Sequence, residues 1–422
     1  MSTQRLSIEV LTRAIKDDAA AFRCRRKLQP AGGPGDKVFP PTFAGAVYAV
    51  EERRMPGRAE PVTCVVLDTV QSQANRMELA LQEALDAGRI KVPLVKVDFG
   101  PLSPTSSKPA EERLIDDVGT ITSLQAPHRL ADAILRDSEI EEGEPGPDGK
   151  QPRVAFRKSA KGGLLNTVSQ QNATALYQLC PTALIFGMWD STGPKGGLGA
   201  KFERALVSEV VGIGATVGDL VRGVRRDPLE IRAAVKVLKP ADKNWSIADP
   251  TAKGAVSPSK VNHSSVPFPE QRERKTDENN FAGTTIEYAE QLTTLSLIVL
   301  RRLRFPMNGN TSPEVDIAGR TVLTALGLCA STLAAENGIG LRSRCLLWPD
   351  GPMIWELLEK PGSDPAQFSL TGEQAIALFK QAVTGAKSAG LNWEEIPIRL
   401  VPQQKLVDLV RLSQLEATRE GS

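Results

Sequence analysis

The sequence predicts a fold that mixes α-helices and β-strands, on three observations. Short apolar runs, clearest at residues 62–67 (VTCVVL) and 183–189 (ALIFGMW), have the composition of buried strands. Elsewhere apolar residues recur at the three- and four-residue spacing of an amphipathic helix. The chain has 422 residues, of which 41% are hydrophobic, so it can bury a sizeable core and form more than one lobe.

The helix expected directly after the first of these strands has the clearest pattern. Ala74, Met77, Leu81 and Leu85 recur at helical spacing, and Gly88 follows as a C-terminal stop. This pattern predicts a strand followed by an amphipathic helix in the first quarter of the chain.

A second helix is expected to begin near Pro127. Leu130 and Ile134 form its apolar stripe, while Arg129 and Arg136 are seven residues apart on another face. A helix of this kind would present both arginines to solvent or to a ligand.

The C-terminal third is predicted to be mainly helical. Its apolar residues recur at helical spacing over residues 285–304, 317–336, 371–389 and 403–418. A short strand is expected at residues 344–347.

Three segments rich in Gly, Pro, Ser and Lys are predicted to be loops or insertions, at residues 100–109, 141–152 and 248–278. We therefore divide the chain into a main part, a loop insertion and a mainly helical part, at residues 1–240, 241–284 and 285–422.

Charge gives little indication of a nucleic-acid partner, because 52 Lys and Arg residues face 50 Asp and Glu residues and the net charge is only +2. A phosphate-binding surface must therefore be local. Arg153, Arg157, Lys158 and Lys161 occur with no acid between them, and residues 222–243 hold seven basic and three acidic residues. Each patch alone fits an unevenly charged solvated surface equally well.

The expected location is the cytoplasm, with no membrane partner. No stretch approaches the roughly 18 uninterrupted apolar residues of a membrane span, and the first residues mix charges into their apolar positions as a signal peptide does not. The five cysteines are isolated, with no CxxC pair, which predicts small core residues and neither disulfides nor a zinc site. We expect no cofactor.

A glycine-rich loop at residues 189–204 (WDSTGPKGGLGAKFER) is the most unusual segment. Glycines let backbone N–H groups approach an anion closely, and Lys195, Lys201 and Arg204 would neutralise it. The segment matches neither a Walker A loop nor a GxGxxG fingerprint. Standing alone, it would be a flexible surface hairpin.

Two aromatic residues flank this basic loop. Trp189 and Phe202 beside cations suit an unstacked RNA strand, since bases stack on aromatic rings. Core packing is the alternative for both, and it is the stronger one for Phe202.

The start of the predicted helix near residue 70 is a second candidate site. Gln71, Gln73, Asn75 and Arg76 lie where a helix offers free N–H donors and a favourable field for phosphate. Amides and an arginine there can bind phosphates or base edges. A capped, solvated helix start is the alternative.

The chain has only two histidines, His128 and His263. It therefore lacks a multi-histidine metal site, and no GxSxG motif supports a Ser/His/Asp triad. His128 has the position of a helix-start residue.

Several blocks of the first half of the chain resemble a known family. They are residues 39–45 (FPPTFAG), 65–81 (VVLDTVQSQANRMELAL), 123–137 (SLQAPHRLADAILRD), 172–213 and 225–231 (RRDPLEI). In this collinear order they resemble the RAMP-superfamily backbone subunit, the Cas-seven type, of type I-G (formerly I-U) CRISPR Cascade complexes.

The resemblance implies a modified RRM-like, ferredoxin-like palm with inserted thumb and finger loops, completed by the helical C-terminal part. Residues 241–284 are then the possible thumb. It also implies partners: CRISPR guide RNA, the target DNA strand, neighbouring copies of the chain, a Cascade large subunit and a Cas-five/Cas-six-type fusion subunit. The aromatic RNP1 run of ordinary RRM proteins is missing, which puts stacking on a sheet face in doubt.

The function expected from this resemblance is binding of guide RNA without catalysis. The residues expected to contact RNA combine cations, amides and one aromatic ring: Gln71, Gln73, Asn75, Arg76, His128, Arg129, Arg136, Arg157, Lys158, Lys161, Trp189, Lys195, Lys201 and Arg204.

Two other functions stay open at this point. A backbone subunit could cleave bound target RNA through a loop aspartate such as Asp190 with a metal ion. An α/β enzyme could instead bind a phosphorylated small molecule at the loop of residues 189–204.

Overall fold

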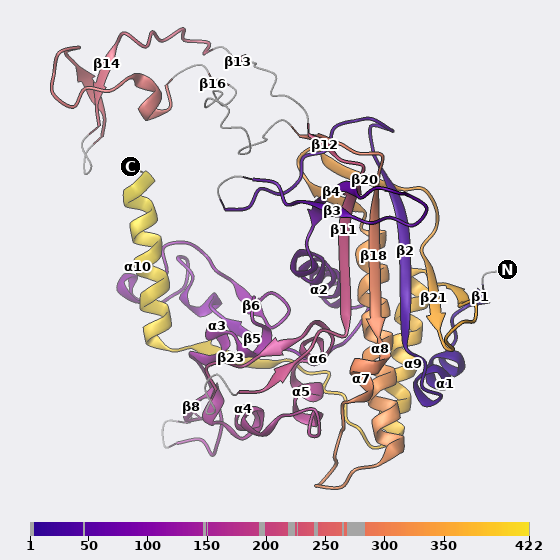
Figure 1. Cartoon of the computed structure of the whole chain (residues 1–422). Helices are drawn as coiled ribbons and strands as arrows, with labels where there is room; N and C mark the ends of the chain where they lie inside the picture. Colours follow the sequence, from indigo (N-terminus) through magenta and orange to yellow (C-terminus); the bar gives the residue numbers. More distant parts are fainter. Residues whose placement is uncertain are drawn as a thin grey trace.

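The structure is a computed structural model of the whole chain, and it confirms the mixed α and β class (Figure 1). It describes all residues except 1–3, 45–46, 147–148, 150, 194–198, 218–223, 226, 240–243, 264–265, 268–282 and 422.

A large sheet forms the body of the molecule, with its central strands antiparallel to one another. Its strands follow the order β1 (Gln4–Arg5), β22 (Ala366–Ser369), β21 (Ile354–Leu358), β2 (Ala21–Pro30), β18 (Tyr288–Ser296), β11 (Leu206–Ile213), β4 (Val62–Asp68) and β3 (Val50–Arg53). The hairpin of β19 (Ile339–Arg342) and β20 (Cys345–Pro349) pairs with β2 at one end.

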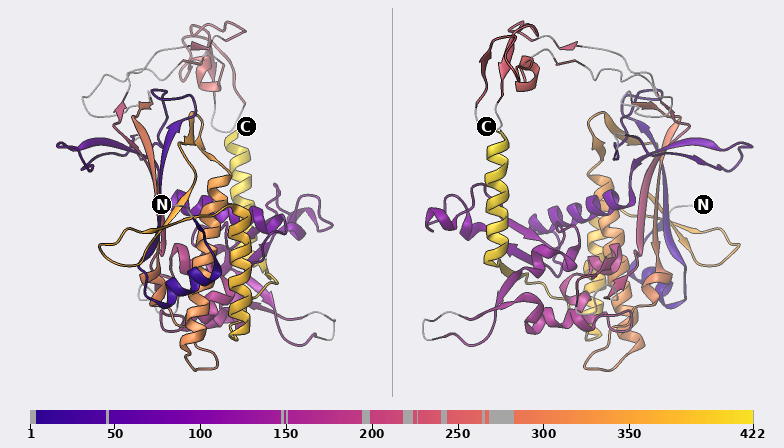
Figure 2. Two further views of the ribbon diagram at one scale, coloured as in Figure 1. Left: turned by 90° about the vertical axis from the view of Figure 1, so that its right-hand side faces the viewer. Right: turned by 60° about the vertical axis from the view of Figure 1, so that its left-hand side comes forward.

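Helices cover one face of this sheet (Figure 2). The long helix α8 (Pro313–Glu336) packs against α1 (Ile8–Lys16), α2 (Val70–Asp86) and α9 (Gly372–Ser388), and a short helix, α7 (Leu297–Arg301), follows β18. Inward-facing side chains of the central strands, such as Phe22 and Leu295, are fully buried beneath them. Side chains on the opposite face, such as Arg25 and Leu292, are exposed.

A second sheet lies beside the first and is built from segments far apart in the chain. Its order is β6 (Thr120–Thr122), β5 (Val95–Asp98), β23 (Ile398–Pro402), β7 (Ser138–Glu141) and β8 (Arg153–Ala155). The C-terminal strand β23 is its centre, parallel to β5 and antiparallel to β7. The last helix, α10 (Gln404–Gly421), projects from this sheet (Figure 1).

An arm leaves the large sheet between two adjacent strands. It is inserted between β11 and β18, and the pair of β12 (Thr216–Val217) and β17 (Thr284–Thr285) forms its base. The arm carries the hairpin of β14 (Lys236–Leu238) and β15 (Ser246–Ala248) and a turn of 3-10 helix, η7 (Pro258–Val261), and it extends away from the body (Figure 1). The insertion predicted at residues 241–284 falls within this arm, although several of its residues lie outside the described part.

The strand and helix predicted first are confirmed. β4 covers residues 62–68, and α2 follows after Thr69, whose hydroxyl accepts a hydrogen bond from the Ser72 backbone N–H. Gly88 adopts φ +68, a conformation that a residue with a Cβ rarely reaches, and thus ends the helix.

The helix predicted over residues 285–304 is wrong for most of its length. Residues 288–296 form β18, which is paired on both sides along its whole length by β2 and β11. Ala289, Gln291, Thr293 and Leu295 are buried at strand spacing, while the residues between them are more exposed. The apolar residues of this segment also fit a helical spacing. Pairing with two neighbouring strands at the centre of the sheet nevertheless makes the segment a strand. Strands β19, β21, β22 and β23 were likewise not expected in a mainly helical part.

Two further predictions need correction. The apolar run 183–189 is mostly helical: α6 spans Thr182–Phe186, and only β9 (Met188–Trp189) is a strand, because a fully buried apolar run has no periodicity that separates the two forms. The helix expected from Pro127 is broken into η3 (Arg129–Ala131) and α3 (Ala133–Arg136), since Asp132 is extended and caps α3 with its carboxylate.

Within the described residues, α8 alone is long and apolar enough to cross a membrane by length and composition. In the fold, 83% of its most apolar window is buried against the sheet and the neighbouring helices. It begins with Pro313 in its first turn, where the missing N–H leaves no helical hydrogen bond unmade.

Candidate nucleic-acid interface

An open groove of about 630 Å³ lies beside the two-stranded ribbon of β9 and β10 (Lys201–Phe202). We call it the ribbon groove. It draws side chains from η3 and α3, from the end of α6 and from the ribbon: Pro127, His128, Arg129, Ala131, Ala133, Arg136, Phe186, Gly187, Met188, Trp189, Ser191, Thr192, Lys201, Phe202, Glu203 and Arg204. The groove thus brings together six of the residues predicted to contact RNA.

Trp189 and Lys201 form an exposed part of the ribbon groove. They are directly opposite each other in the ribbon, so their side chains lie on the same face. The Lys201 Nζ atom is 5.6 Å from the centroid of the Trp189 ring, and that ring is 54% exposed. A cation held beside an exposed aromatic face offers a stacking surface and a charge for phosphate at one point.

Arg204 is a second exposed cation at the groove. Within the part of the chain that the structure describes, no carboxylate lies within ion-pair distance of Arg204 or Lys201. The neighbouring Glu203 is paired with Arg302, at 2.8 Å between Oε2 and Nη1. Both cations are therefore available to an external anion.

The turn that leads into the ribbon requires glycine at position 187. Gly187 has φ +84, and a Cβ there would be 3.1 Å from the carbonyl oxygen of Phe202. The close approach lets the chain leave α6 and enter β9 directly beneath the ribbon. The turn thereby sets the position of β9 and of the Trp189 ring that this strand carries.

Arg129 forms the rear wall of the groove rather than its surface. Its Nε and Nη2 atoms donate to the two carboxylate oxygens of Glu78, each at 2.7 Å, and its Nη1 donates to the Gly187 carbonyl at 3.0 Å. The guanidinium also lies over the Phe186 ring, at 5.5 Å from its centroid. All of these groups are buried, so Arg129 ties α2 to the turn before β9.

The buried ion pair changes the acidity of its carboxylate. Burial raises the pKa of the Glu78 carboxyl, and the Arg129 guanidinium opposes this rise. The interaction stabilises the groove's framework only while both partners are present.

His128 and Arg136 lie at the edge of the groove. His128 is exposed, and its backbone N–H donates to Asp132 Oδ2 at 3.0 Å. The Arg136 side chain is 40% exposed and is 3.2 Å from the Asp137 carboxylate, which raises the pKa of Arg136. The His128 ring has no hydrogen-bond partner among the described residues, whereas Arg136 is partly engaged by its neighbour.

The residues at the start of α2 do not line the ribbon groove. Gln71 and Asn75 are exposed. Gln73 is only 5% exposed: its amide donates to Asp68 at 2.6 Å and accepts from Ser208 and Gln291. Its hydrogen-bonding capacity is used inside the protein, so the surface role predicted for Gln73 is not available in this fold.

Arg76 is similarly engaged by the protein. It donates to Asp68 Oδ2 at 3.0 Å and to the Leu341 carbonyl at 2.8 Å. Arg342 reaches the same buried Asp68 from the β19 hairpin. Arg76 therefore joins α2 to that hairpin, and the group at the start of α2 reduces to Gln71 and Asn75 at the surface.

Three further predicted residues, Arg157, Lys158 and Lys161, do not line the ribbon groove. Lys158 and Lys161 are exposed on η4 (Phe156–Lys158) and α4 (Ala160–Gly163). Arg157 is paired with the buried Asp190, with 2.7 Å between Nη2 and Oδ2. Lys195 lies outside the described residues.

All five cysteines are free and buried, as predicted for small core residues. Burial raises the pKa of the Cys24 and Cys329 thiols to about 12. Among the described residues no group of three or more His, Cys, Asp or Glu side chains is placed to hold a metal ion.

Sequence reasoning did not identify Glu78 or Gly187 as parts of this region. A glutamate on an amphipathic helix looks like a surface residue, and only the contact between α2 and η3 shows that it is buried. No local pattern indicates that contact.

Residues 22–217 match the model of the family described as CRISPR-associated protein GSU0053, so this part of the chain is similar to that family. The match confirms the resemblance to a Cas-seven-type CRISPR subunit, and it includes both the start of α2 and the ribbon groove. None of the curated proteins matches the chain.

Proposed function

We propose that this protein is the CRISPR RNA-binding backbone subunit of a type I-G Cascade interference complex. It polymerises along the guide RNA and presents the guide for pairing with target DNA. The observation that carries the proposal is the ribbon groove, where the exposed Trp189 ring and the available cations Lys201 and Arg204 lie together in the family-matched part.

The groove favours an unpaired RNA strand because it combines stacking with charge. A base can stack on Trp189, and Lys201 and Arg204 can neutralise the phosphates on either side of that base. His128 adds a hydrogen-bonding group at the edge. None of these groups is arranged to read one particular base edge, so binding is largely blind to sequence.

Exposed Lys158 and Lys161 extend the positive surface beyond the groove. A nearly neutral protein makes only a few phosphate contacts per copy. Successive copies on one guide add their contacts, and this repetition supplies the affinity.

The arrangement of the large sheet is consistent with the palm domain expected of a backbone subunit. The strands β2, β18, β11 and β4 form an antiparallel centre with helices on one face, as in an RRM-like, ferredoxin-like palm. The arm between β12 and β17 is the candidate thumb. The partners are neighbouring copies of the chain, the Cascade large subunit, a Cas-five/Cas-six-type fusion subunit and the target DNA strand, in the cytoplasm.

We also propose that the subunit does not cleave RNA. The Asp190 carboxylate, which a metal-dependent cleavage would use, is buried and paired with Arg157 at 2.7 Å. A carboxylate neutralised in this way has little charge left for a metal ion. Incubation of the assembled complex with complementary RNA and Mg²⁺ tests this point, and cuts at regular intervals would contradict it.

RNA carried through purification tests the main proposal. The full-length protein, purified at low salt, should show a high ratio of absorbance at 260 nm to 280 nm that nuclease treatment removes. Its affinity for single-stranded RNA should fall linearly with the logarithm of the salt concentration. A protein that carries no RNA at low salt and binds none in titration would refute the proposal.

A further inference from the structure

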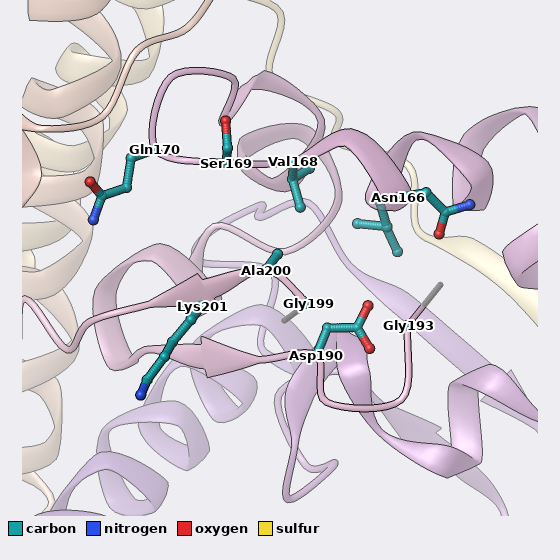
Figure 3. A pocket seen from close by; sticks show the side chains of 10 residues that line it. Asn166, Val168, Ser169, Gln170, Asp190, Gly193, Gly199, Ala200 and Lys201 are labelled. Carbon is teal, nitrogen blue, oxygen red and sulfur yellow. The ribbon is translucent and has the colours of Figure 1, made fainter. Parts of the chain in front are cut away.

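Two pockets outside the ribbon groove differ in their charge. Figure 3 shows the first, a pocket of about 190 Å³ beside the ribbon, whose charged lining residues in the described part of the chain are Asp190 and Lys201. These two charges balance, so that pocket favours neither an anion nor a cation. The second pocket, of about 280 Å³, lies where the segment after α2 meets α9, and its lining is basic. We call it the helix pocket.

The helix pocket has an apolar floor and a charged rim. The floor consists of buried side chains: Ile90, Phe379, Val383 and Trp393. The rim carries four cations and one carboxylate: Arg89, Lys91, Lys380, Lys387 and Glu395. Four positive charges against one negative charge leave the lining with a net charge of +3, which favours an anionic partner.

Glu395 shows that this rim binds a carboxylate. Its Oε2 atom is 3.0 Å from the Lys91 Nζ atom, and its Oε1 atom pairs with Lys387. Hydrogen bonds from Lys387 and Lys91 lower the pKa of the Glu395 carboxyl. Arg89 and Lys380 are exposed on the same rim, and no carboxylate of the described residues pairs with either. Two cations of the rim are therefore available to a carboxylate from outside.

The hairpin of β7 and β8 is an acidic counterpart on the same chain. Residues 137–148 hold six acidic residues and no basic one. Glu141 pairs with Arg153, whereas the carboxylates of Glu139 and Glu144 have no partner in the part of the chain that the structure describes. Figure 2 shows the hairpin projecting from the body of the molecule, where a partner can reach it.

The two surfaces are complementary in charge, but they do not neutralise each other within one chain. No ion pair among the described residues joins the acidic hairpin to the rim of the helix pocket. Because the surfaces come from different elements, a contact between them in two copies is heterologous. A heterologous contact that does not close on itself repeats along a filament.

A nucleic-acid strand is the other anionic occupant to consider. Phe379 and Trp393 are buried in the floor, so the helix pocket offers a base no exposed aromatic ring of the kind that Trp189 provides in the ribbon groove. The partnerless glutamates of the hairpin, in contrast, match the partnerless cations of the rim. The charges therefore favour a protein segment.

We propose that the helix pocket binds the β7–β8 hairpin of a neighbouring copy of the chain, with Arg89 and Lys380 facing the carboxylates of Glu139 and Glu144. The inference rests on the proposed function, in which copies follow one another along a guide RNA, and it adds the contact that joins two successive copies. Since the contact is between proteins, it is compatible with any guide sequence.

Cooperative binding to RNA measures this contact. Full-length protein is titrated onto a short single-stranded RNA that holds one copy and onto a long one that holds several. Wild type should bind the long RNA more tightly per copy, because neighbouring copies stabilise each other. R89E/K380E should lower the ratio of the long-RNA to the short-RNA affinity about tenfold or more, since like charges then face each other. The matched control K16E/K360E reverses two exposed lysines outside the pocket and should keep the wild-type ratio.

Charge reversal of the hairpin gives the reciprocal test. E139K/E144K should also lower the ratio. An equal mixture of E139K/E144K and R89E/K380E should recover it, because the reversed pocket of one variant meets the reversed hairpin of the other. A mixture that does not recover would overturn the pairing. Binding of the short RNA reports that each variant is folded.

Carbodiimide coupling of wild-type protein on the long RNA decides the same point even if a variant does not fold. It should join Lys380 of one copy to Glu139 or Glu144 of a differently isotope-labelled copy, and the absence of this cross-link between copies would overturn the pairing.

The short RNA separates the inference from the proposed function. Equal wild-type affinities per copy for the two RNAs would overturn the inference and leave the proposed function intact. An R89E/K380E protein that loses affinity for the short RNA as well would show that the helix pocket binds RNA itself, which would also overturn the inference. A wild-type protein that binds neither RNA would refute the proposed function.

Discussion

The buried pair of Arg129 and Glu78 gives the sharpest prediction of the account. The variant R129M keeps the length and apolar stem of the side chain but removes both hydrogen bonds to Glu78 and the one to the Gly187 carbonyl. Glu78 is only 3% exposed, so the variant leaves a buried carboxylate without its counter-charge. Removing one partner of such a pair costs about 3–5 kcal/mol. This is a large part of the roughly 5–15 kcal/mol that stabilises a typical domain.

The loss should depend on pH in a defined direction. Burial already raises the pKa of Glu78, and without Arg129 that pKa rises further. A group whose pKa is raised in the folded state stabilises it at low pH, and this contribution disappears as the pH rises through the folded-state pKa. The stability deficit of R129M relative to wild type should therefore grow from acid to neutral pH.

Urea unfolding at pH 5 and pH 7 measures the deficit directly. The control is R136M, because Arg136 and Asp137 form a partly exposed pair whose loss should cost no more than about 1 kcal/mol. The double variant E78Q/R129M should recover part of the stability, since it removes the uncompensated charge. An R129M variant as stable as R136M, or a deficit that shrinks as the pH rises, would refute the reasoning.

Three further predictions concern the groove and the core. K201A should weaken binding of all RNA sequences alike and lower the slope of log affinity against log salt by about 0.7, the value for one phosphate contact on a single strand; an unchanged slope would exclude that contact. W189A should cost about 1–3 kcal/mol of binding energy per stacked base while leaving the salt slope unchanged; an affinity equal to wild type would contradict the stacking role. The cysteines should not react with a thiol reagent at pH 8 until the protein unfolds, because Cys24 and Cys329 have pKa values raised to about 12 by burial; rapid labelling of the native protein would contradict their burial.

The sequence was sufficient where structure is determined by local contacts. β4 and α2 were predicted because the alternation, the helical spacing and the stop at Gly88 all indicate the same elements. The glycine-rich loop was identified because its glycines and lysines are unusual in any context. The family was recognised from long collinear blocks, which the match over residues 22–217 confirms.

The sequence was insufficient where pairing between distant segments determines the local structure. β18 has a helical spacing of apolar residues, and only its partners β2 and β11 make it a strand. Gln73 is a polar residue near the start of a helix, where a surface position is expected. In the structure it is the centre of a buried hydrogen-bond network that reaches Ser208 and Gln291. The two hydrogen bonds that Gln73 accepts join residues 135 and 218 positions apart, so no window of sequence contains them.

The candidate site was therefore found in part. Trp189 and Lys201 were predicted as parts of one loop, and the ribbon register pairs them directly, with both side chains on the same face. Arg129 was expected to contact RNA, but it supports the groove from behind because Glu78 on α2 binds it.

Ultraviolet crosslinking of RNA to the full-length protein, followed by mapping of the crosslinked peptides by mass spectrometry, tests the central claim most directly. If the ribbon groove holds the guide, the main crosslinks should fall on the ribbon around Trp189 and on the segment that contains His128. Crosslinks confined to the exposed face of the large sheet, or to the surface of α10, would contradict the account.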